Sequence, residues 1–289
     1  MARVASKSSR VAEVLEFDHE LIAQREAAVA QETDEEILDR LRERFAVLDE
    51  MTRAVKTGDV RAMIVSGPPG VGKSHGVEQV LEKTDLFNKI SNGKPKYEIV
   101  KGALSSLGLY AKLYEFSAPG SVIVFDDSDS IFCDELSLNL LKGALDSGAH
   151  RWISWNTDSR MLRNEGIPDR FDFLGSIVFI TNIKFAHVRS KKLRDHLAAL
   201  ESRCHYIDLD MDTQREKLLR IRQVINDNEM LAKYEFSESI NKELIDFIFD
   251  NKDRLRELSL RTVLKTADLR KAFPNAWQAM AKTTLMRRG

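Results

Sequence analysis

The feature that most constrains the fold is a glycine-rich loop that directly follows a short apolar stretch. Residues 62–66 run into Gly67-Pro68-Pro69-Gly70-Val71-Gly72-Lys73-Ser74, which matches the pattern G-x-x-x-x-G-K-[ST]. In such a loop glycines let backbone amides turn inward around a phosphate, and the helix that follows adds its positive end. The alternative is a Gly/Pro turn with a solvent-exposed lysine, but these residue types coincide by chance in only about one chain in a hundred of this length. The sequence therefore predicts a strand, a phosphate-binding loop and a helix.

Short apolar runs recur along the middle of the chain. Five of them, nearly unbroken, lie at residues 62–65, 97–100, 122–125, 177–180 and 206–209. Continuous rather than alternating apolar residues are typical of strands covered on both faces, and the stretches between these runs are long enough for crossover helices. The middle of the chain is therefore expected to be an α/β domain with a parallel sheet.

The rest of the chain reads as helical. Thr33 and Glu36 form a capping-box pattern before apolar residues at spacings of three and four. Beyond residue 211, Asp212, Ser237 or Ser239, and Ser259 are expected to cap three helices, and a fourth follows Pro274. We expect a basic flexible tail over 1–16, a helical segment over 17–56, an α/β core over 57–211 and an all-helical domain over 212–289.

Composition excludes several classes of protein. With 43% apolar and 31% charged residues the chain can bury a core, and with 44 Lys and Arg against 45 Asp and Glu it has no overall field that favours nucleic acid or anionic lipid. Two cysteines, Cys133 and Cys204, are too few for a disulfide framework or a Cys-rich zinc site. No run of eighteen apolar residues occurs, and the first ten residues are polar and basic, so we expect a cytoplasmic protein without membrane partners.

Polar side chains end two of the predicted strands. Asp126 and Asp127 directly follow residues 122–125, and Asn182 follows the run at 177–180. A buried parallel strand delivers its last residues to the carboxyl edge of the sheet, beside the phosphate loop. There Asp126 can hold a magnesium ion and Asp127 can deprotonate a water, while the neutral amide of Asn182 can contact both a phosphate and that water. Seen alone, each is also an ordinary turn residue.

The order of these features resembles that of the AAA+ ATPases, over about residues 45–275. Residues 67–74 resemble Walker A, residues 122–127 Walker B and Asn182 sensor 1. Arg203, just before the fifth run, resembles a trans-acting arginine finger, and Arg261 resembles sensor 2. The resemblance implies a five-stranded parallel P-loop sheet in the order 5-1-4-3-2, flanked by helices, with a small helical lid. It also implies a homo-oligomeric ring, most often of six subunits.

The same resemblance assigns the site. It implies that ATP is bound by Gly67, Pro68, Pro69, Gly70, Val71, Gly72, Lys73, Ser74, His75 and Arg261, with Mg²⁺ held by Ser74 and Asp126. Lys73, Asp127, Asn182 and Arg203 are the expected catalytic residues. Walker B usually ends in Asp-Glu, whereas here Asp127 sets the base carboxylate back by one methylene. This predicts slow hydrolysis or a water-bridged base, with Asp129 as a less favoured substitute.

Two further segments are candidates for mechanical work. Tyr110 and Tyr114 follow the second predicted strand, near the place where many AAA+ rings carry an aromatic pore residue, but their spacing fits helix packing equally well. The insert 151–175 interleaves Trp152, Trp155, Arg160, Arg163 and Arg170. Such residues can bind single-stranded nucleic acid, a partner protein or a neighbouring subunit.

The expected function is magnesium-dependent ATP hydrolysis at subunit interfaces, coupled to movement of a macromolecule that is nucleic acid or protein. The alternative is a nucleotide-controlled loader or switch on a nucleic-acid-associated complex. It is suggested by Ser202-Arg203-Cys204, which resembles the finger motif of clamp-loader subunits, although those have a third helical collar domain. A small-molecule P-loop kinase is disfavoured, because such chemistry needs neither Asn182, Arg203 nor a lid.

Overall fold

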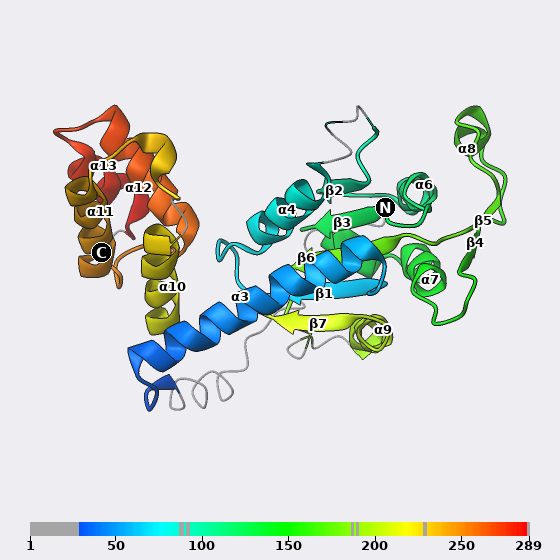
Figure 1. Ribbon diagram of the computed structural model, residues 1–289, viewed down its shortest axis with the longest axis horizontal. Helices are drawn as coiled ribbons and strands as arrows, with labels where there is room; N and C mark the ends of the chain where they lie inside the picture. Colours follow the sequence, from blue (N-terminus) through cyan, green and yellow to red (C-terminus); the bar gives the residue numbers. More distant parts are fainter. Residues whose placement is uncertain are drawn as a thin grey trace, which may run out of the picture. The chain divides into compact units, whose positions relative to one another are not determined.

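The computed structural model describes residues 29–86, 90, 93–185, 188, 191–227 and 230–287 (Figure 1). The expected tail over 1–16 and the beginning of the expected helical segment over 17–56 lie outside the described residues. The described chain divides into two compact units. The first holds residues 44–67 and the described part of 73–209, and the second holds residues 29–43, 68–72 and the described part of 210–287.

The first unit is built on a five-stranded parallel sheet. Its strands are β1 (Ala62–Ser66), β2 (Tyr97–Lys101), β3 (Val122–Asp126), β6 (Ser176–Thr181) and β7 (His205–Asp208). They lie in the order β2-β3-β6-β1-β7, which is the expected order 5-1-4-3-2 read from the other edge. Every residue of β1, β3 and β6 is buried, as the unbroken apolar runs predicted. The α/β prediction is confirmed.

Helices cover both faces of this sheet (Figure 1). The unit contains the C-terminal part of α3 (Asp34–Thr57), α4 (Lys73–Thr84), α6 (Ser106–Glu115), η1 (Asp129–Cys133), α7 (Glu135–Ala144) and α9 (Lys191–Glu201). On one face the buried cluster includes Ile64, Phe125, Phe179, Leu109 and Leu141. On the other it includes Val65, Val124, Val178, Leu48 and Leu81. Neighbouring strand residues thus enter different layers, and the carboxyl edge of the sheet is left for polar side chains.

The insert between β3 and β6 has structure that the sequence did not predict. Two three-residue strands, β4 (Trp152–Ser154) and β5 (Arg170–Asp172), pair antiparallel, and the short helix α8 (Arg160–Asn164) lies between them in the sequence. Tyr110 of α6 is fully buried against Phe171 of β5, with ring centroids 5.1 Å apart, and its hydroxyl donates to Pro168 O at 2.8 Å. Helix packing is therefore the correct interpretation of Tyr110, and it does not act as a pore aromatic.

The second unit is helical. It contains α10 (Gln214–Asp227), η3 (Ala232–Tyr234), α11 (Glu238–Asp250), α12 (Leu260–Ala272) and α13 (Trp277–Leu285), around a core that includes Leu244, Val263 and Trp277. Ser237 and Ser259 precede α11 and α12 as expected, but neither side chain makes a capping hydrogen bond. Before α10 the cap is Thr213 rather than the expected Asp212, because Thr213 and Glu216 bond reciprocally through their side chains and backbone amides.

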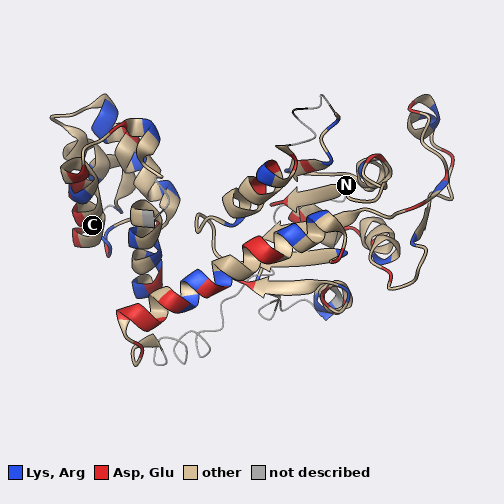
Figure 2. Ribbon diagram, in the orientation of Figure 1, with Lys and Arg blue, Asp and Glu red and all other residues tan. Residues whose placement is uncertain are grey.

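The N-terminal turn of α3 belongs to the second unit. The predicted capping box is confirmed there, since Thr33 N donates to Glu36 Oε2 at 2.7 Å and Glu36 N donates to Thr33 Oγ1 at 3.2 Å. Acidic and basic residues are interleaved along α3 (Figure 2). None of the helices in the described ranges is long and apolar enough to cross a lipid bilayer.

Candidate functional site: a phosphate loop at the carboxyl edge of the sheet

The glycine-rich loop connects β1 to α4, as the sequence predicted. Gly70 and Gly72 have φ angles of +72° and +104°, which an L-residue with a side chain rarely adopts. Lys73 is the first residue of α4, and its side chain is buried within the first unit. The loop therefore has the backbone freedom that close approach to a phosphate requires.

Ser74 and Asp126 come together although 52 residues separate them. Ser74 Oγ donates to Asp126 Oδ1 at 2.8 Å, and Asp126 is buried at the end of the interior strand β3. These two side chains are the expected magnesium ligands. A hydroxyl and a carboxylate are hard oxygen donors, which suit Mg²⁺ when phosphates and water complete the shell. Within the described ranges no group of three or more His, Cys, Asp or Glu is arranged to hold a metal ion.

A second chain of contacts joins three of the expected catalytic side chains. Lys73 Nζ donates to Asn182 Oδ1 at 2.8 Å and to Gly67 O at 2.6 Å. Asn182 Nδ2 in turn donates to Asp127 Oδ1 at 2.7 Å. Three segments that are far apart in the sequence thus meet at one edge of the sheet. Both Asp127 and Asn182 are exposed, so a ligand and water can reach them.

The backbone explains part of the unusual residue at position 127. Asp127 has φ +52°, in the left-handed region, and its amide donates to Ile180 O at 3.0 Å on the neighbouring strand. Asp and Asn enter this region more readily than Glu, because their short polar side chains bond locally. An aspartate at this position therefore matches the local backbone.

Asp129 interacts electrostatically with Asp127, Asp126 and Lys73. Thr181 Oγ1 donates to Asp129 Oδ1 at 2.7 Å. Burial raises the pKa of Asp129 to about 6, and the nearby Asp127 and Asp126 charges act in the same direction, while the Thr181 hydrogen bond and Lys73 oppose them. The carboxyl of Asp129 is held by the sheet itself and is partly buried, whereas that of Asp127 is exposed. Asp127 is thus the better placed of the two to meet a solvent water.

Sequence reasoning missed Lys101, the last residue of β2. Its Nζ lies 3.6 Å from Asp126 Oδ2, and the side chain is 62% exposed. A lysine after an apolar run is unremarkable by itself. The only signal in the sequence was its place at the end of a strand expected to lie beside the Asp126 strand, which needs the sheet order to interpret.

Arg203 is not part of this cluster. It is exposed, its guanidinium donates to Ala199 O, and it lines a cavity of about 550 Å³ with Ala62 and His205. Ala62 and His205 are the first residues of β1 and β7, so Arg203 lies at the amino edge of the sheet, whereas Lys73, Asp126 and Asn182 lie at the carboxyl edge. A phosphate bound at the carboxyl edge would therefore lie at the opposite edge of the sheet from Arg203.

Two more expected residues lie near the loop segments. His75, in the first turn of α4, is exposed in the first unit. In the second unit, Leu260 N donates to Gly70 O at 2.9 Å, and a Cβ on Gly70 would come within 2.7 Å of Ser259 Cβ. Arg261 follows Leu260 in the first turn of α12 and is exposed. Pro68, Pro69 and Val71 contribute backbone to the same loop.

The insert is anchored by arginine and presents one exposed tryptophan. The buried guanidinium of Arg151 donates to Ala144 O at 3.0 Å and Gly175 O at 2.8 Å, and burial lowers its pKa to about 10. Arg170 lies over the Trp152 ring at 4.4 Å, and Trp152 is 49% exposed, whereas Trp155 packs on Tyr110. The insert holds four arginines and four acidic residues, so its formal charges balance.

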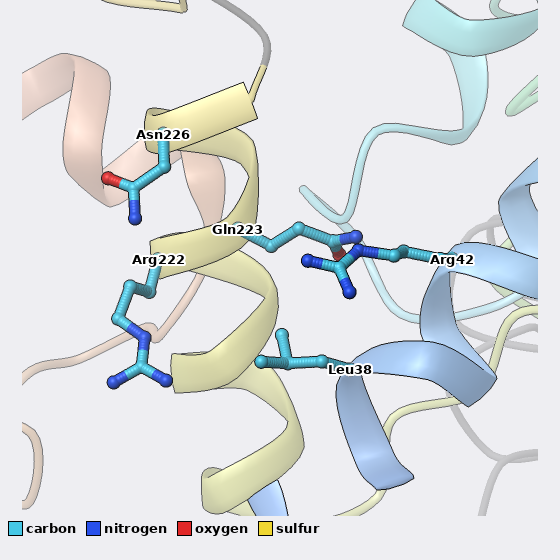
Figure 3. Close-up of a pocket in the computed structure, with 5 residues that line it drawn as sticks. All are labelled: Leu38, Arg42, Arg222, Gln223 and Asn226. Atoms are coloured by element: carbon cyan, nitrogen blue, oxygen red, sulfur yellow. The ribbon is translucent and has the colours of Figure 1, made fainter. Parts of the chain in front are cut away.

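A separate cavity of about 420 Å³ lies in the second unit between α3 and α10. It is lined by Leu38, Arg42, Arg222, Gln223 and Asn226, none of which is an expected site residue. Figure 3 shows Gln223 and Arg42 pointing toward each other, while Arg222 and Asn226 lie on the other side of α10. These polar groups do not converge on one point, in contrast to the cluster around Lys73.

The five-stranded parallel sheet and the glycine-rich loop between β1 and α4 identify this chain as an α/β P-loop protein with a helical C-terminal unit. Comparison with known proteins then gives its family. The chain is 36% identical over 253 residues to the "Uncharacterized 36.7 kDa protein in nrdC-mobD intergenic region" of Enterobacteria phage T4, an alignment that covers 87% of this chain and 76% of the phage protein. The chain belongs to the family of that phage protein. No family model matches it.

Two solved structures resemble this chain only weakly. One is "Replication initiator DnaA bound to AMPPCP and single-stranded DNA", with a TM-score of 0.44 and 13% identity over 82% of this chain. The other is a DNA replication initiation factor, with a TM-score of 0.39 and 12% identity over 78% of this chain. The alignments cover 63% and 59% of those chains, which is less than two thirds of their length. The assignment of the fold rests on the sheet order and the loop.

Proposed function

We propose that this protein is a magnesium-dependent ATPase of the AAA+ type. One observation carries the proposal: Ser74 contacts Asp126, and Lys73 contacts Asn182, which contacts Asp127, all at the carboxyl edge of a sheet in the order 5-1-4-3-2. A structural role alone would not require a buried lysine, a buried carboxylate and an exposed carboxylate to meet at a glycine-rich loop. In this proposal residues 57–211 form the ATPase core and residues 212–289 the lid.

Each side chain has a defined task in this proposal. The loop from Gly67 to Gly72 provides backbone amides for the β-phosphate, and Lys73 exchanges Gly67 O and Asn182 Oδ1 for phosphate oxygens. Ser74 and Asp126 hold Mg²⁺, which when bound neutralises phosphate charge.

The exposed groups act on the attacking water. Asp127 accepts the proton of the water, and Asn182, which already donates a hydrogen bond to Asp127, orients the carboxylate and the water. His75 and Arg261 complete the nucleotide contacts from α4 and α12.

The position of Arg203 supports catalysis between subunits. Because Arg203 lies at the opposite edge of the sheet from Lys73, it can act on a phosphate only in a neighbouring copy. A planar guanidinium with a permanent charge suits this role. We therefore propose a homo-oligomer in the cytoplasm, with a ring of six as the preferred form, in which hydrolysis depends on assembly.

The direct test combines turnover with mass. ATPase rates of the full chain are measured alone and with single-stranded DNA, duplex DNA or unfolded protein, beside native mass spectrometry with and without nucleotide. The proposal expects hydrolysis that rises with oligomer population, and stimulation by one macromolecule identifies the substrate class. Absence of nucleotide binding would refute it, and hydrolysis by a monomer at full rate would refute the interface.

A second candidate is a nucleotide-controlled loader or switch on a nucleic-acid-associated complex. The observation that favours it is the short carboxylate of Asp127, which is held by Asn182 and by a left-handed backbone. A base whose side chain is one methylene shorter than glutamate and is held by a hydrogen bond predicts slow ATP turnover. Single-turnover hydrolysis far slower than nucleotide-driven assembly would favour the switch, and steady turnover faster than assembly would exclude it.

A further inference from the structure

The buried carboxylate of Asp126 has a second neighbour that the phosphate-loop motif does not include. Lys101 and Asp126 are direct register partners on the parallel strands β2 and β3, so both side chains start from the same edge of the sheet. Their charged atoms, Lys101 Nζ and Asp126 Oδ2, lie 3.6 Å apart. The side chain of Asp126 is 7% exposed and that of Lys101 is 62% exposed, so a solvent-facing cation contacts a buried anion.

Both oxygens of Asp126 are therefore engaged, by different kinds of partner. Oδ1 accepts a hydrogen bond from Ser74 at 2.8 Å, whereas the contact from Oδ2 to Lys101 exceeds the usual hydrogen-bond length. A strongly hydrated ammonium on a flexible stem can leave such a loose contact easily. Many exposed lysines form ion pairs that are incidental. Here the anion, Asp126, is buried, and a buried charge needs a compensating charge nearby.

We propose that Lys101 is a displaceable counter-cation for Asp126, and that it competes with Mg²⁺ for this carboxylate. The inference rests on the proposed function, since it assumes that Ser74 and Asp126 hold the ion. Lys101 keeps the buried charge compensated until metal and nucleotide bind, and the long exposed side chain then moves away into solvent. It thereby sets the Mg²⁺ concentration at which nucleotide binding becomes tight.

The test measures binding rather than turnover. Affinity for a fluorescent non-hydrolysable ATP analogue is determined over a series of Mg²⁺ concentrations for the full-length wild type, Lys101→Met and Lys101→Arg. Removal of the charge in Lys101→Met is expected to lower the Mg²⁺ concentration for half-maximal effect about two- to fivefold, the range of a solvent-facing ion pair. Lys101→Arg keeps the charge and should stay near the wild-type value.

Lys112→Met is the matched control. It removes one positive charge from the same unit, but Lys112 pairs with Glu98 and Glu115 and not with Asp126. An unchanged or increased Mg²⁺ requirement in Lys101→Met, or an equal decrease in Lys112→Met, would overturn the inference while leaving the ATPase proposal intact. Failure of the wild type to bind the analogue at any Mg²⁺ concentration would refute both.

Discussion

The partly buried carboxyl of Asp129 leads to a prediction about protein stability that can be tested without nucleotide or partner. Its carboxyl accepts a hydrogen bond from Thr181 at 2.7 Å, and its pKa is raised from 3.8 to about 6, chiefly by burial. Asp129→Asn removes the ionisation but keeps an oxygen that can accept from Thr181. The variant should therefore be more stable than the wild type wherever the native carboxyl has to ionise.

The raised pKa of Asp129 determines the direction and size of the expected change in the free energy of unfolding. Because the folded pKa is above the unfolded one, the folded protein holds the proton more tightly, and this group's contribution to stability is fully present below about pH 4 and lost as the pH rises through about 6. A shift of about two pKa units corresponds to about 3 kcal/mol. Asp129→Asn should thus raise the free energy of unfolding by up to about 3 kcal/mol at pH 8 and by roughly half of that at pH 5.

The assay is urea denaturation of the full chain without nucleotide, followed by circular dichroism at both pH values. Glu78→Gln is the control, because it removes one acidic charge from an exposed position on α4 in the same unit. It should change the free energy of unfolding by less than about 0.5 kcal/mol at either pH. An Asp129→Asn variant that is no more stable than the wild type at pH 8, or whose gain does not shrink at pH 5, would refute the reasoning.

Three other predictions test separate parts of the account. Asp127→Asn should keep ATP binding and lower hydrolysis by about two to four orders of magnitude, and normal turnover by this variant would contradict the prediction. Asp127→Glu should lower the free energy of unfolding by about 1 kcal/mol because the backbone at position 127 is left-handed, and full stability of this variant would contradict that prediction. Arg203→Ala should lose about three to five orders of magnitude in turnover, and mixing it with Asp127→Asn subunits should restore part of the activity, so full activity of Arg203→Ala alone would exclude a trans finger. Gly175→Ala should lower the free energy of unfolding by about 1–3 kcal/mol, since its Cβ would lie 2.1 Å from Phe116 O; an unchanged melting temperature would show that this contact relaxes.

The sequence predicted the sheet well because its signal is physical and continuous. A strand such as β3 is covered on both faces, so every residue from Val122 to Phe125 is apolar and the run stands out. The strands β4 and β5 carry only three residues each and are partly exposed, and such short elements leave no comparable pattern. Asp212 and Thr213 are both suitable N-cap residues for α10, and only the structure shows that Thr213 makes the hydrogen bonds to Glu216.

Parts of the candidate site could be predicted and parts could not. Lys73 and Ser74 begin α4 after the glycine-rich loop, and Asp126 ends β3, so linear patterns are sufficient to predict their place at the sheet edge. Lys101 meets Asp126 only because β2 lies beside β3, a pairing that no local pattern encodes. The raised pKa of Asp129 likewise depends on its burial, which comes from tertiary packing.

The central claim is that this loop binds a nucleotide through Lys73. Its most direct test is equilibrium binding of a fluorescent non-hydrolysable ATP analogue to the wild type and to Lys73→Ala in the presence of Mg²⁺, with circular dichroism to show that both are folded. We expect saturable binding by the wild type and no measurable binding by Lys73→Ala, because the variant lacks the buried ammonium that would contact the phosphates. Equal affinity of the two proteins, or no binding by a folded wild type, would contradict it.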